Sequence, residues 1–502
     1  MSKEILIIKL EKFCIFMMII TLPIINLPKR FTVPAFGSNL SLYFLLFLIF
    51  IVAFQLIIGE EKINKKFKNF ILIYMLWIIL TSIHGIYAYP YYHLVSLSGS
   101  SLIIKISTFF HISQDNNTYK VLFLFLKSLL EGFKYFILPW LGSYAIYHAL
   151  KKEKYPFAFI RKAFVTLAIC LGIYAIPEIL IFKLNLIEAI KILEITNPYI
   201  YDVKSYLGWY PPIIWTGQQL RSYCIEPSIL GAISGAIIPF LWSLIIDYKN
   251  INSIALYIYY FMLPIMSKSR TAIVVLTVVC SQILLYIKSI KNYKRFLLIC
   301  IFSTLIGIGL GISNWINPFS SITKDNKNDR QVSETVDNYI KNNVDTVIDP
   351  NARSNGSRLI NIKSHFNVLI KAPVMGTGMF LKDMYVKENL VSGAMNNIEI
   401  KAITEGIEAE GIFKYSYGNV NDYIFIGTSI GLIGLLIQFF PVLWLFVQFA
   451  KKLGFRDQKI VTIIITITAS LTTMMTGTSG LGLYILVALG YVLVSNYTCR
   501  GN

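Results

Sequence analysis

The chain has 502 residues, of which 55% are hydrophobic and 15% are charged, and its mean hydropathy is +0.62. This composition excludes an ordinary soluble globular protein and indicates a helical protein that crosses a membrane several times. The formal net charge of +19 does not by itself indicate a nucleic-acid partner, because many of the basic residues lie in short loops between apolar runs.

Apolar runs long enough to cross a hydrocarbon core of ~30 Å recur along nearly the whole chain. We therefore predict an all-α, polytopic fold with about twelve transmembrane helices. The predicted spans cover residues 11–28, 40–59, 69–88, 121–148, 163–182, 226–246, 251–267, 271–288, 295–314, 421–450, 460–477 and 480–498. The fourth run is longer than one crossing requires, and Lys127 and Glu131 within it suggest that its first part lies along the membrane interface.

Four loops orient the chain in the membrane. Residues 60–68, 151–162, 288–295 and 451–459 contain 4, 5, 4 and 4 Lys/Arg residues, and all four loops fall on one side of the predicted bundle. By the positive-inside rule that side is cytoplasmic. We therefore expect both termini in the cytoplasm.

The same orientation divides the chain into three regions. Residues 1–314 hold spans one to nine with the outer loops 89–120 and 183–225, residues 315–420 form one large outer loop domain, and residues 421–502 hold the last three spans. In the large loop 12 basic residues are balanced by 12 acidic residues, so the sequence predicts no nucleic-acid partner there.

The large loop contains a predicted amphipathic helix. Ser357 is a suitable N-cap, Arg358 would occupy the first helical position, and apolar residues recur at helical spacing until Pro373 ends the helix. A Gly-x-Gly turn, Gly376 and Gly378, follows. A helix N-terminus beside a guanidinium attracts anions, so we predict an anion site at Arg358; the alternative is a solvated arginine.

Further basic residues stand at the outer ends of other predicted spans. Arg221 precedes the sixth span, at whose start lies Glu226, and Lys268 and Arg270 lie at the junction of spans seven and eight. Each of them alone is commonly a charged side chain that reaches the membrane surface. Arginines that converge on one outer pocket would instead suit a phosphate, because guanidinium binds phosphate through two parallel hydrogen bonds.

Four short sequence segments, or patches, resemble those of a known family. They are the R-x-x-x-x-E-P-S of Arg221–Ser228, the S-R-T-A of residues 269–272, "SRLINIKSHFNVLIKAPVMGTG" in the large loop, and "NDYIFIGTSIGLIG" entering span ten. With these patches in this order, the chain resembles the O-antigen polymerase and O-antigen ligase superfamily of bacterial glycosyltransferases. The resemblance implies a GT-C-like helical fold in the bacterial inner membrane, with the large loop in the periplasm.

The resemblance also implies a chemistry. Donor and acceptor would be polyprenyl (undecaprenyl) diphosphate-linked oligosaccharides, with no metal or other cofactor, and Arg221, Arg270 and Arg358 would stabilise the charge that develops on the leaving diphosphate. The outer segments contain no D-x-D, H-E-x-x-H or Cys/His cluster, which agrees with a metal-independent reaction. The further residues expected at the substrate are Lys268, Gly376, Gly378, His365, Asn421, Asp422 and Tyr423.

The polymerase is preferred over the ligase for one reason. Ligases of the superfamily carry a histidine immediately before the asparagine that precedes span ten, and here Val420 stands before Asn421. Glu226 is then the best candidate for a general base, and the alternative is a partner of Arg221 or a helix cap. His365, on the same helix face as Arg358, either contacts substrate or is a structural residue.

Other partners and functions follow from the same observations. Membrane lipid and a chain-length regulator protein are the additional partners that we expect. A lipid-linked oligosaccharide flippase or other transporter is the alternative from another functional class, and it would carry charges inside its spans. The predicted spans here are nearly free of charges, apart from Lys127, Glu131, Lys134 and Glu178. This scarcity favours the enzyme over the transporter.

Overall fold

The computed structural model of the chain describes residues 3–33, 37–59, 63–91, 101–109, 117–202, 218–287, 353–452, 457–477 and 480–498, with the single residues 95, 111, 113 and 213. The described residues form helices and loops without a β-strand, apart from one isolated bridge between Val33 and Gly37. The predicted span 295–314 and the loop up to residue 352 lie outside the described residues.

Most of the helices follow the predicted apolar runs, but the first lies earlier than predicted, since it ends at Ile20 and the rest of the predicted span 11–28 is not helical. The first half of the chain contains α1 (Lys3–Ile20), α2 (Leu40–Ile58), α3 (Lys65–Tyr87), α4 (Ser101–Phe109), α5 (Asn117–Gly132), α6 (Leu138–Lys151), α7 (Pro156–Leu184), α8 (Ile190–Ile200), α9 (Pro227–Tyr248), α10 (Ile251–Met266) and α11 (Arg270–Ile287). The second half contains α14 (Arg353–Lys371), α15 (Lys382–Glu388), α16 (Ile398–Glu410), α17 (Asp422–Lys452), α18 (Gln458–Met474) and α19 (Gly482–Thr498). A π-helical turn, Phe133–Ile137, joins α5 to α6 within the predicted fourth span.

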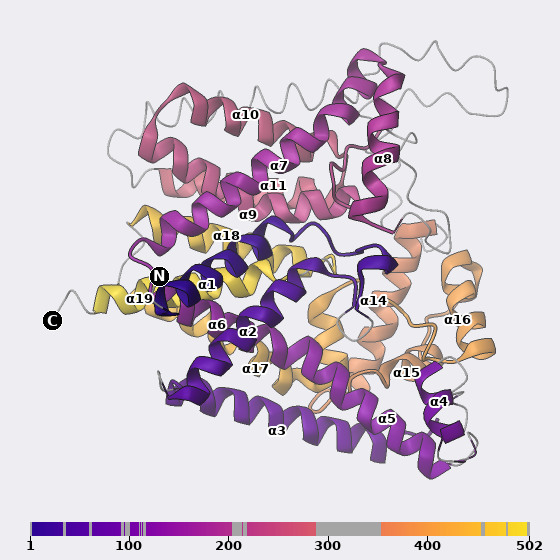
Figure 1. The fold of residues 1–502 in the computed structure, drawn as a ribbon. Coiled ribbons are helices and arrows are strands. Elements are labelled where there is room, and N and C mark those ends of the chain that lie inside the picture. Colours follow the sequence, from indigo (N-terminus) through magenta and orange to yellow (C-terminus); the bar gives the residue numbers. More distant parts are fainter. Residues whose placement is uncertain are drawn as a thin grey trace.

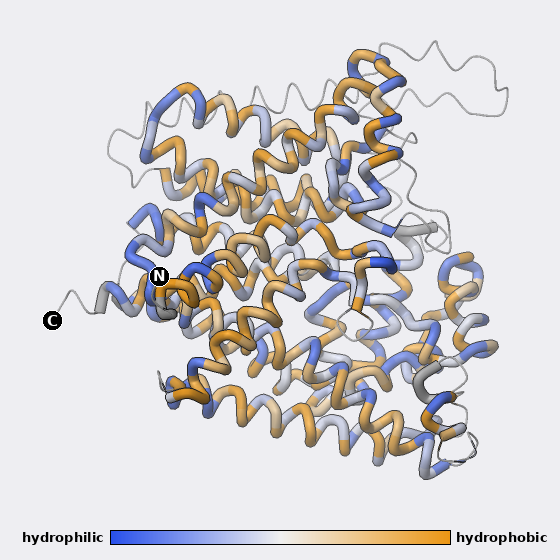
Figure 2. Tube along the Cα trace, viewed as in Figure 1, coloured by the Kyte–Doolittle hydropathy of each residue, from blue (hydrophilic) through white to orange (hydrophobic). Residues whose placement is uncertain are grey.

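Six of the described helices are long and apolar enough to cross a membrane, namely α2, α3, α7, α9, α11 and α17. The shorter apolar helices α10 and α18 and residues 482–496 of α19 follow the same pattern. Apolar residues run along most of the bundle, and the hydrophilic residues gather in the connections and on α16 (Figure 2). The chain is therefore an all-helical membrane protein, and the total of twelve spans and the GT-C class stay predictions.

The described ends of the chain lie away from the helices of the large loop. In Figure 1 the start of α1 and the end of α19 are at the left, and α8, α14, α15 and α16 are at the right. Such a separation is expected when the two regions lie on opposite sides of a membrane.

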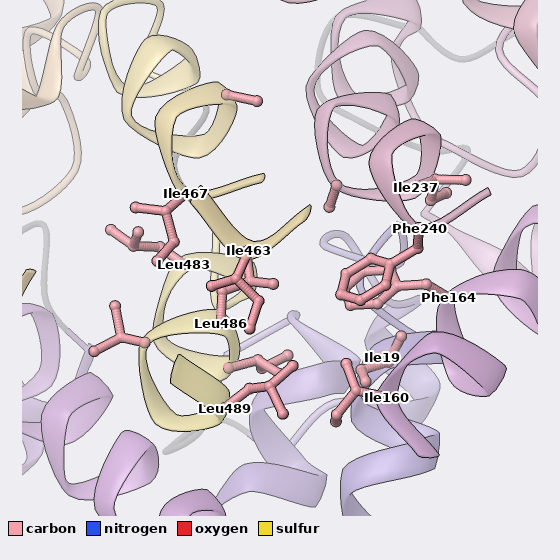
Figure 3. Close-up of a cluster of buried hydrophobic side chains, with 14 of the residues drawn as sticks. Ile19, Ile160, Phe164, Ile237, Phe240, Ile463, Ile467, Leu483, Leu486 and Leu489 are labelled. Atoms are coloured by element: carbon pink, nitrogen blue, oxygen red, sulfur yellow. The ribbon is translucent and has the colours of Figure 1, made fainter. Parts of the chain in front are cut away.

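The centre of the bundle is a dry packing of large apolar side chains. Phe164 of α7 stacks on Phe240 of α9, with ring centroids 4.7 Å apart, beside Ile19 and Ile160 (Figure 3). Isoleucines of α18 and leucines of α19 face them across the same cluster. Helices in a membrane associate through such close packing, because lipid tails offer no hydrophobic driving force between them.

α17 is broken near its start. Gly431 has φ 73° and ψ 176°, which interrupts the helix. The carbonyl groups of Thr428 and Ser429, freed by the break, accept hydrogen bonds from the N–H groups of Thr377 (2.9 Å) and Gly378 (3.0 Å). The N–H of Leu432 donates to the carbonyl of Pro373, a third residue of the same loop, at 2.8 Å. The loop 373–378 thus restores the hydrogen bonds that the break removes.

The Gly-x-Gly turn is shaped by this insertion. Gly376 and Gly378 have φ +68° and +86°, and a Cβ on Gly376 would lie 2.7 Å from backbone atoms of α17. On the other side, a Cβ on Gly85 of α3 would lie 2.4 Å from the carbonyl oxygen of Thr377. Glycine is needed here because the backbones approach too closely for any side chain. Packing, rather than an open binding surface, accounts for this turn.

Candidate functional site

Three of the predicted basic residues lie in adjoining segments. The segment 218–226 precedes α9, and the N–H of Leu220 donates to the carbonyl of Met266 at the end of α10, at 3.2 Å. The turn that follows Met266 carries Lys268 and leads into α11 at Arg270. α9 and α11 also touch at this end, since a Cβ on Gly231 would lie 2.6 Å from the backbone N of Ala272. The motifs of Arg221 and Arg270 therefore meet at one end of the bundle.

Arg221 is fixed by a carboxylate from α7. Its side chain is 1% exposed, and its Nε lies 3.9 Å from Oε1 of Glu178. The other carboxylate oxygen, Oε2, accepts hydrogen bonds from the backbone N–H groups of Arg221 (3.1 Å) and Ser222 (2.8 Å). The Tyr201 ring lies 5.1 Å from the guanidinium carbon. Charge, hydrogen bonds and an aromatic face together hold this arginine in one place.

Glu178 is the functional neighbour that the sequence alone did not assign. The sequence marks it only as a charge inside a span, forty residues before the segment that it holds. Glu226, which the sequence offered as a partner of Arg221, is exposed at the N-cap position of α9 and makes no capping hydrogen bond there. Its carboxylate accepts a hydrogen bond from Ser228 Oγ at 3.1 Å.

Lys268 adds a second buried cation to the same end. Its side chain is 8% exposed, and it lies within electrostatic reach of Lys183 at the end of α7. Arg270 is half-buried in the first turn of α11. We call Lys183, Arg221, Lys268 and Arg270 the basic cluster. One buried carboxylate, Glu178, lies among them.

Arg358 does not occupy the position predicted for it. α14 begins at Arg353, so Arg358 is in the second turn, and the helix dipole of a free N-terminus does not act there as expected. Ser357 lies inside the helix, and its hydroxyl donates to Glu399 Oε2 of α16, at 2.7 Å. The predicted start at Ser357 was wrong, because the helix already begins at Arg353. Arg358 itself is exposed.

His365 lies in a second polar site, where α14 packs on the start of α17. The pocket there is lined by Ile362, His365, Gly418, Asn419, Val420, Asn421, Ile424 and Phe425. The imidazole is 2% exposed, and its Nδ1 lies 2.9 Å from the carbonyl oxygen of Asn361. Nε2 is buried and has no hydrogen-bond partner among the described residues. We call this the imidazole pocket.

The imidazole is held neutral by its surroundings. Burial is the main cause that lowers the pKa of His365 to about 3, and the positive charge of Lys382 is the second cause, while the hydrogen bond with Asn361 opposes the shift. Lys382 of α15 is 3% exposed and bonds to Asp383 Oδ1 (3.1 Å) and to the carbonyl of Tyr417 (3.3 Å). Its Nζ also lies 5.0 Å from the ring centre of Phe425. No sequence motif singled out Lys382, because its burial depends on the fold of α15.

The residues entering α17 divide into two kinds. Asn421 lines the imidazole pocket and caps α17, its Oδ1 accepting from the N–H of Ile424 at 3.1 Å. Asp422 is buried and bonds to the side chain of Asn419. Tyr423 instead ties α17 to α18, since its hydroxyl donates to the carbonyl of Leu471 at 2.8 Å. Asn421 is the one that faces a pocket.

The described residues can be searched for a group of metal-ligating side chains. Within the described ranges no three His, Cys, Asp or Glu side chains gather as metal ligands would. Much of the large loop lies outside those ranges, and the expectation of a metal-independent reaction stays a prediction.

The comparison with known proteins adds a family. Residues 255–439 match the family model described as O-antigen ligase. That range includes Lys268, Arg270 and the whole imidazole pocket, whereas Arg221 lies before it. No curated protein matches the chain. The family match, with the four patches in their order, supports the placement of this chain in the O-antigen ligase and polymerase superfamily.

Proposed function

We propose that the protein is a membrane glycosyltransferase that polymerises polyprenyl diphosphate-linked oligosaccharide units into a surface polysaccharide, at the outer face of the inner membrane. The observation that carries the proposal is the basic cluster. Two separate motifs bring Arg221 and Arg270 to the same end of the bundle, and Lys268 lies in the turn that leads into α11 at Arg270. A diphosphate is the ligand chemistry that such a group of cations suits best.

The cluster suits the leaving group of this reaction. An acceptor hydroxyl attacks the anomeric carbon of the donor, the bond from that carbon to the diphosphate oxygen breaks, and its electron pair stays on the diphosphate. Fixed cations beside the departing oxygens lower the energy of that transition state. Because Arg221 is held by Glu178 and Tyr201, it need not reorganise when the charge develops. Arg358 is proposed as a further diphosphate ligand that approaches from the loop domain.

A ligase that transfers polysaccharide to a lipid A core is the second candidate. The preference for the polymerase came from Val420, which stands where ligases carry a histidine. His365 places an imidazole in the pocket that Val420 also lines. The absence of a histidine at position 420 is therefore a weaker argument against a ligase than the sequence suggested. The two candidates differ in their acceptor. A repeat unit on polyprenyl diphosphate would be extended by a polymerase, and lipid A core would be glycosylated by a ligase.

Arg270→Lys and Arg270→Ala test the proposed function. We expect polymer formation in washed membranes, supplied with lipid-linked repeat units and a chelator, to fall roughly 30- to 1000-fold in Arg270→Ala, the effect of removing about 2–4 kcal/mol of transition-state stabilisation. Arg270→Lys should fall less, because it keeps the charge but loses the planar two-pronged contact.

Lys363→Ala is the matched control, because it removes an exposed basic residue of α14. Its activity should equal that of the wild type at equal protein level. Wild-type activity in Arg270→Ala would contradict the diphosphate role, and loss of activity with the chelator, restored by a divalent cation, would contradict metal independence. Product on lipid A core alone would identify the ligase.

A further inference from the structure

We propose that the imidazole pocket is the binding site for the attacking hydroxyl of the acceptor, with His365 Nε2 as the atom that accepts its hydrogen bond. This rests on the proposed function, and it assigns the acceptor side of that reaction to a residue of the loop domain. The basic cluster would serve the donor diphosphate.

The orientation of the ring follows from its one hydrogen bond. A backbone carbonyl can only accept, so the short contact between Nδ1 and the Asn361 carbonyl places the proton on Nδ1. In a neutral imidazole Nε2 then carries the free lone pair. The backbone is in contact with α17 as well, because Thr428 Oγ1, which donates to the Ile424 carbonyl at 2.7 Å, lies 3.2 Å from the carbonyl oxygen of His365. The pocket therefore presents a fixed hydrogen-bond acceptor.

That acceptor is buried without a partner. Nε2 of His365 forms no hydrogen bond with the described residues, and a polar atom enclosed in this way is costly unless something binds it. The pocket has room for about one water-sized group, which fits a hydroxyl rather than a whole sugar ring. Asn419 and Asn421 line the other wall, where hydrogen bonds to Asp422 and to the Met475 carbonyl hold their side-chain amides in place.

One charged group acts on the ring from a neighbouring element. It is Lys382 of α15, which is paired with Asp383, while Asp422 of α17 bonds to the side chain of Asn419 in the pocket wall. Lys382 disfavours a second positive charge on the ring, so His365 stays an acceptor rather than a donor. An imidazolium would present N–H groups to the hydroxyl hydrogen and could not bind it.

A weak base is sufficient for this step. The hydroxyl oxygen forms the new bond to the anomeric carbon while the bond to the diphosphate oxygen breaks with its electron pair. The attacking oxygen thereby becomes an oxonium, which is far more acidic than an imidazolium. Its proton passes to Nε2, and from there to water, because Lys382 prevents the imidazolium from persisting.

Moving the imidazole across the pocket tests the assignment. We expect His365→Ala to lower polymer formation about 100-fold at saturating donor, with the KM for the acceptor raised and binding of the donor unchanged. Val420 lines the same pocket, so a histidine there can present an imidazole to the same space. Polymer formation by the double variant His365→Ala/Val420→His should therefore be at least about tenfold higher than that of His365→Ala. Val420→Phe, which fills the pocket and keeps His365, should be as inactive as His365→Ala.

The outcomes separate this inference from the proposed function. If Arg270→Ala is inactive but His365→Ala and Val420→Phe both turn over like wild type, the enzyme assignment stands and the acceptor assignment is overturned. If His365→Ala does not accumulate in membranes, Val420→Phe still decides, because it removes no native side-chain hydrogen bond of the pocket. Unchanged activity in Val420→Phe would show that no hydroxyl enters there.

Discussion

At the scale of single residues, the charged side chains of this protein differ mainly in what holds them. Arg221 and Lys382 are both nearly inaccessible, and each has a carboxylate beside it, Glu178 and Asp383 respectively. A buried cation that loses its carboxylate is strongly destabilising, whereas an exposed charge contributes little. Burial and partner, rather than charge alone, therefore distinguish Arg221 and Lys382 from surface residues such as Arg358.

Glu178→Ala is expected to destabilise the protein by roughly 3–5 kcal/mol, because it removes the acceptor of two backbone N–H groups and the counter-charge of Arg221. Thermal unfolding of the detergent-solubilised protein, with its level in membranes, measures this. Glu226→Ala, which removes an exposed carboxylate, should change stability by no more than about 0.5 kcal/mol. Equal losses in the two variants would mean that Glu178 is not the anchor of this segment.

The neutral His365 makes stability depend on pH. Its pKa in the folded protein is about 3, below the ordinary value of 6.5, so the unfolded chain takes up the proton first as pH falls. The contribution is complete above about pH 6.5 and is lost between there and about pH 3, at roughly 1.4 kcal/mol per pH unit. His365→Gln, which cannot titrate, should show a shallower fall of the unfolding temperature over pH 6.5 to 4. Parallel curves for the two proteins would place the acid sensitivity elsewhere.

At the scale of elements, the loop domain and the membrane helices are joined through the break in α17. Trp77 of α3 donates to the carbonyl of Ile430 at 3.0 Å, and loop 373–378 bonds on both sides of Gly431. An interrupted helix is tolerated at membrane depth only where protein groups take over its hydrogen bonds. The break thus attaches α14, and with it the imidazole pocket, to the bundle.

Gly431→Ala should weaken that attachment. A Cβ at this position would lie 1.9 Å from the carbonyl oxygen of Val374, in a backbone conformation that costs a non-glycine residue about 1–3 kcal/mol even without the clash. We expect faster proteolysis of the 373–378 loop and a lower unfolding temperature. Gly482→Ala is the matched control, since a Cβ there meets nothing within 4 Å, and it should behave like the wild type. Normal protease resistance in Gly431→Ala would show that the loop does not depend on the break.

At the scale of the whole molecule, the bundle has two different ends. The start of α1 and the end of α19 lie at one end, and the helices α14, α15 and α16 lie at the other (Figure 1). The imidazole pocket is formed by α14 and the start of α17. In the proposed function the lipid-linked units are polymerised at the outer face of the membrane. The loop-domain end must therefore face away from the cytoplasm.

A reporter that is active only outside the cytoplasm tests this topology. Fused after residue 340 it should be active, and fused after residue 455 it should be inactive, because the basic loop 451–459 favours the cytoplasmic side. The reverse result would place the loop domain in the cytoplasm and would contradict the orientation on which the proposed function depends.

The sequence by itself determined the class of this protein and the positions of most helices. Hydropathy and length suffice for that, because a lipid-facing helix must be apolar along its whole course, whatever its neighbours are. The sequence also identified Arg221, Lys268, Arg270 and His365 as candidate site residues. It could not show which of them meet, since a contact between distant segments leaves no local pattern.

Only the tertiary structure decided which side chains are hydrogen-bond or ion-pair partners. Glu178 reaches Arg221 across forty residues, Ser357 bonds to Glu399 rather than capping α14, and the Gly-x-Gly turn serves the break in α17 rather than an open surface. The neutrality of His365 depends on burial against α17 and on Lys382, neither of which is adjacent to it in sequence. Long-range packing sets burial, and burial sets which polar groups must be paired and which are left to bind a substrate.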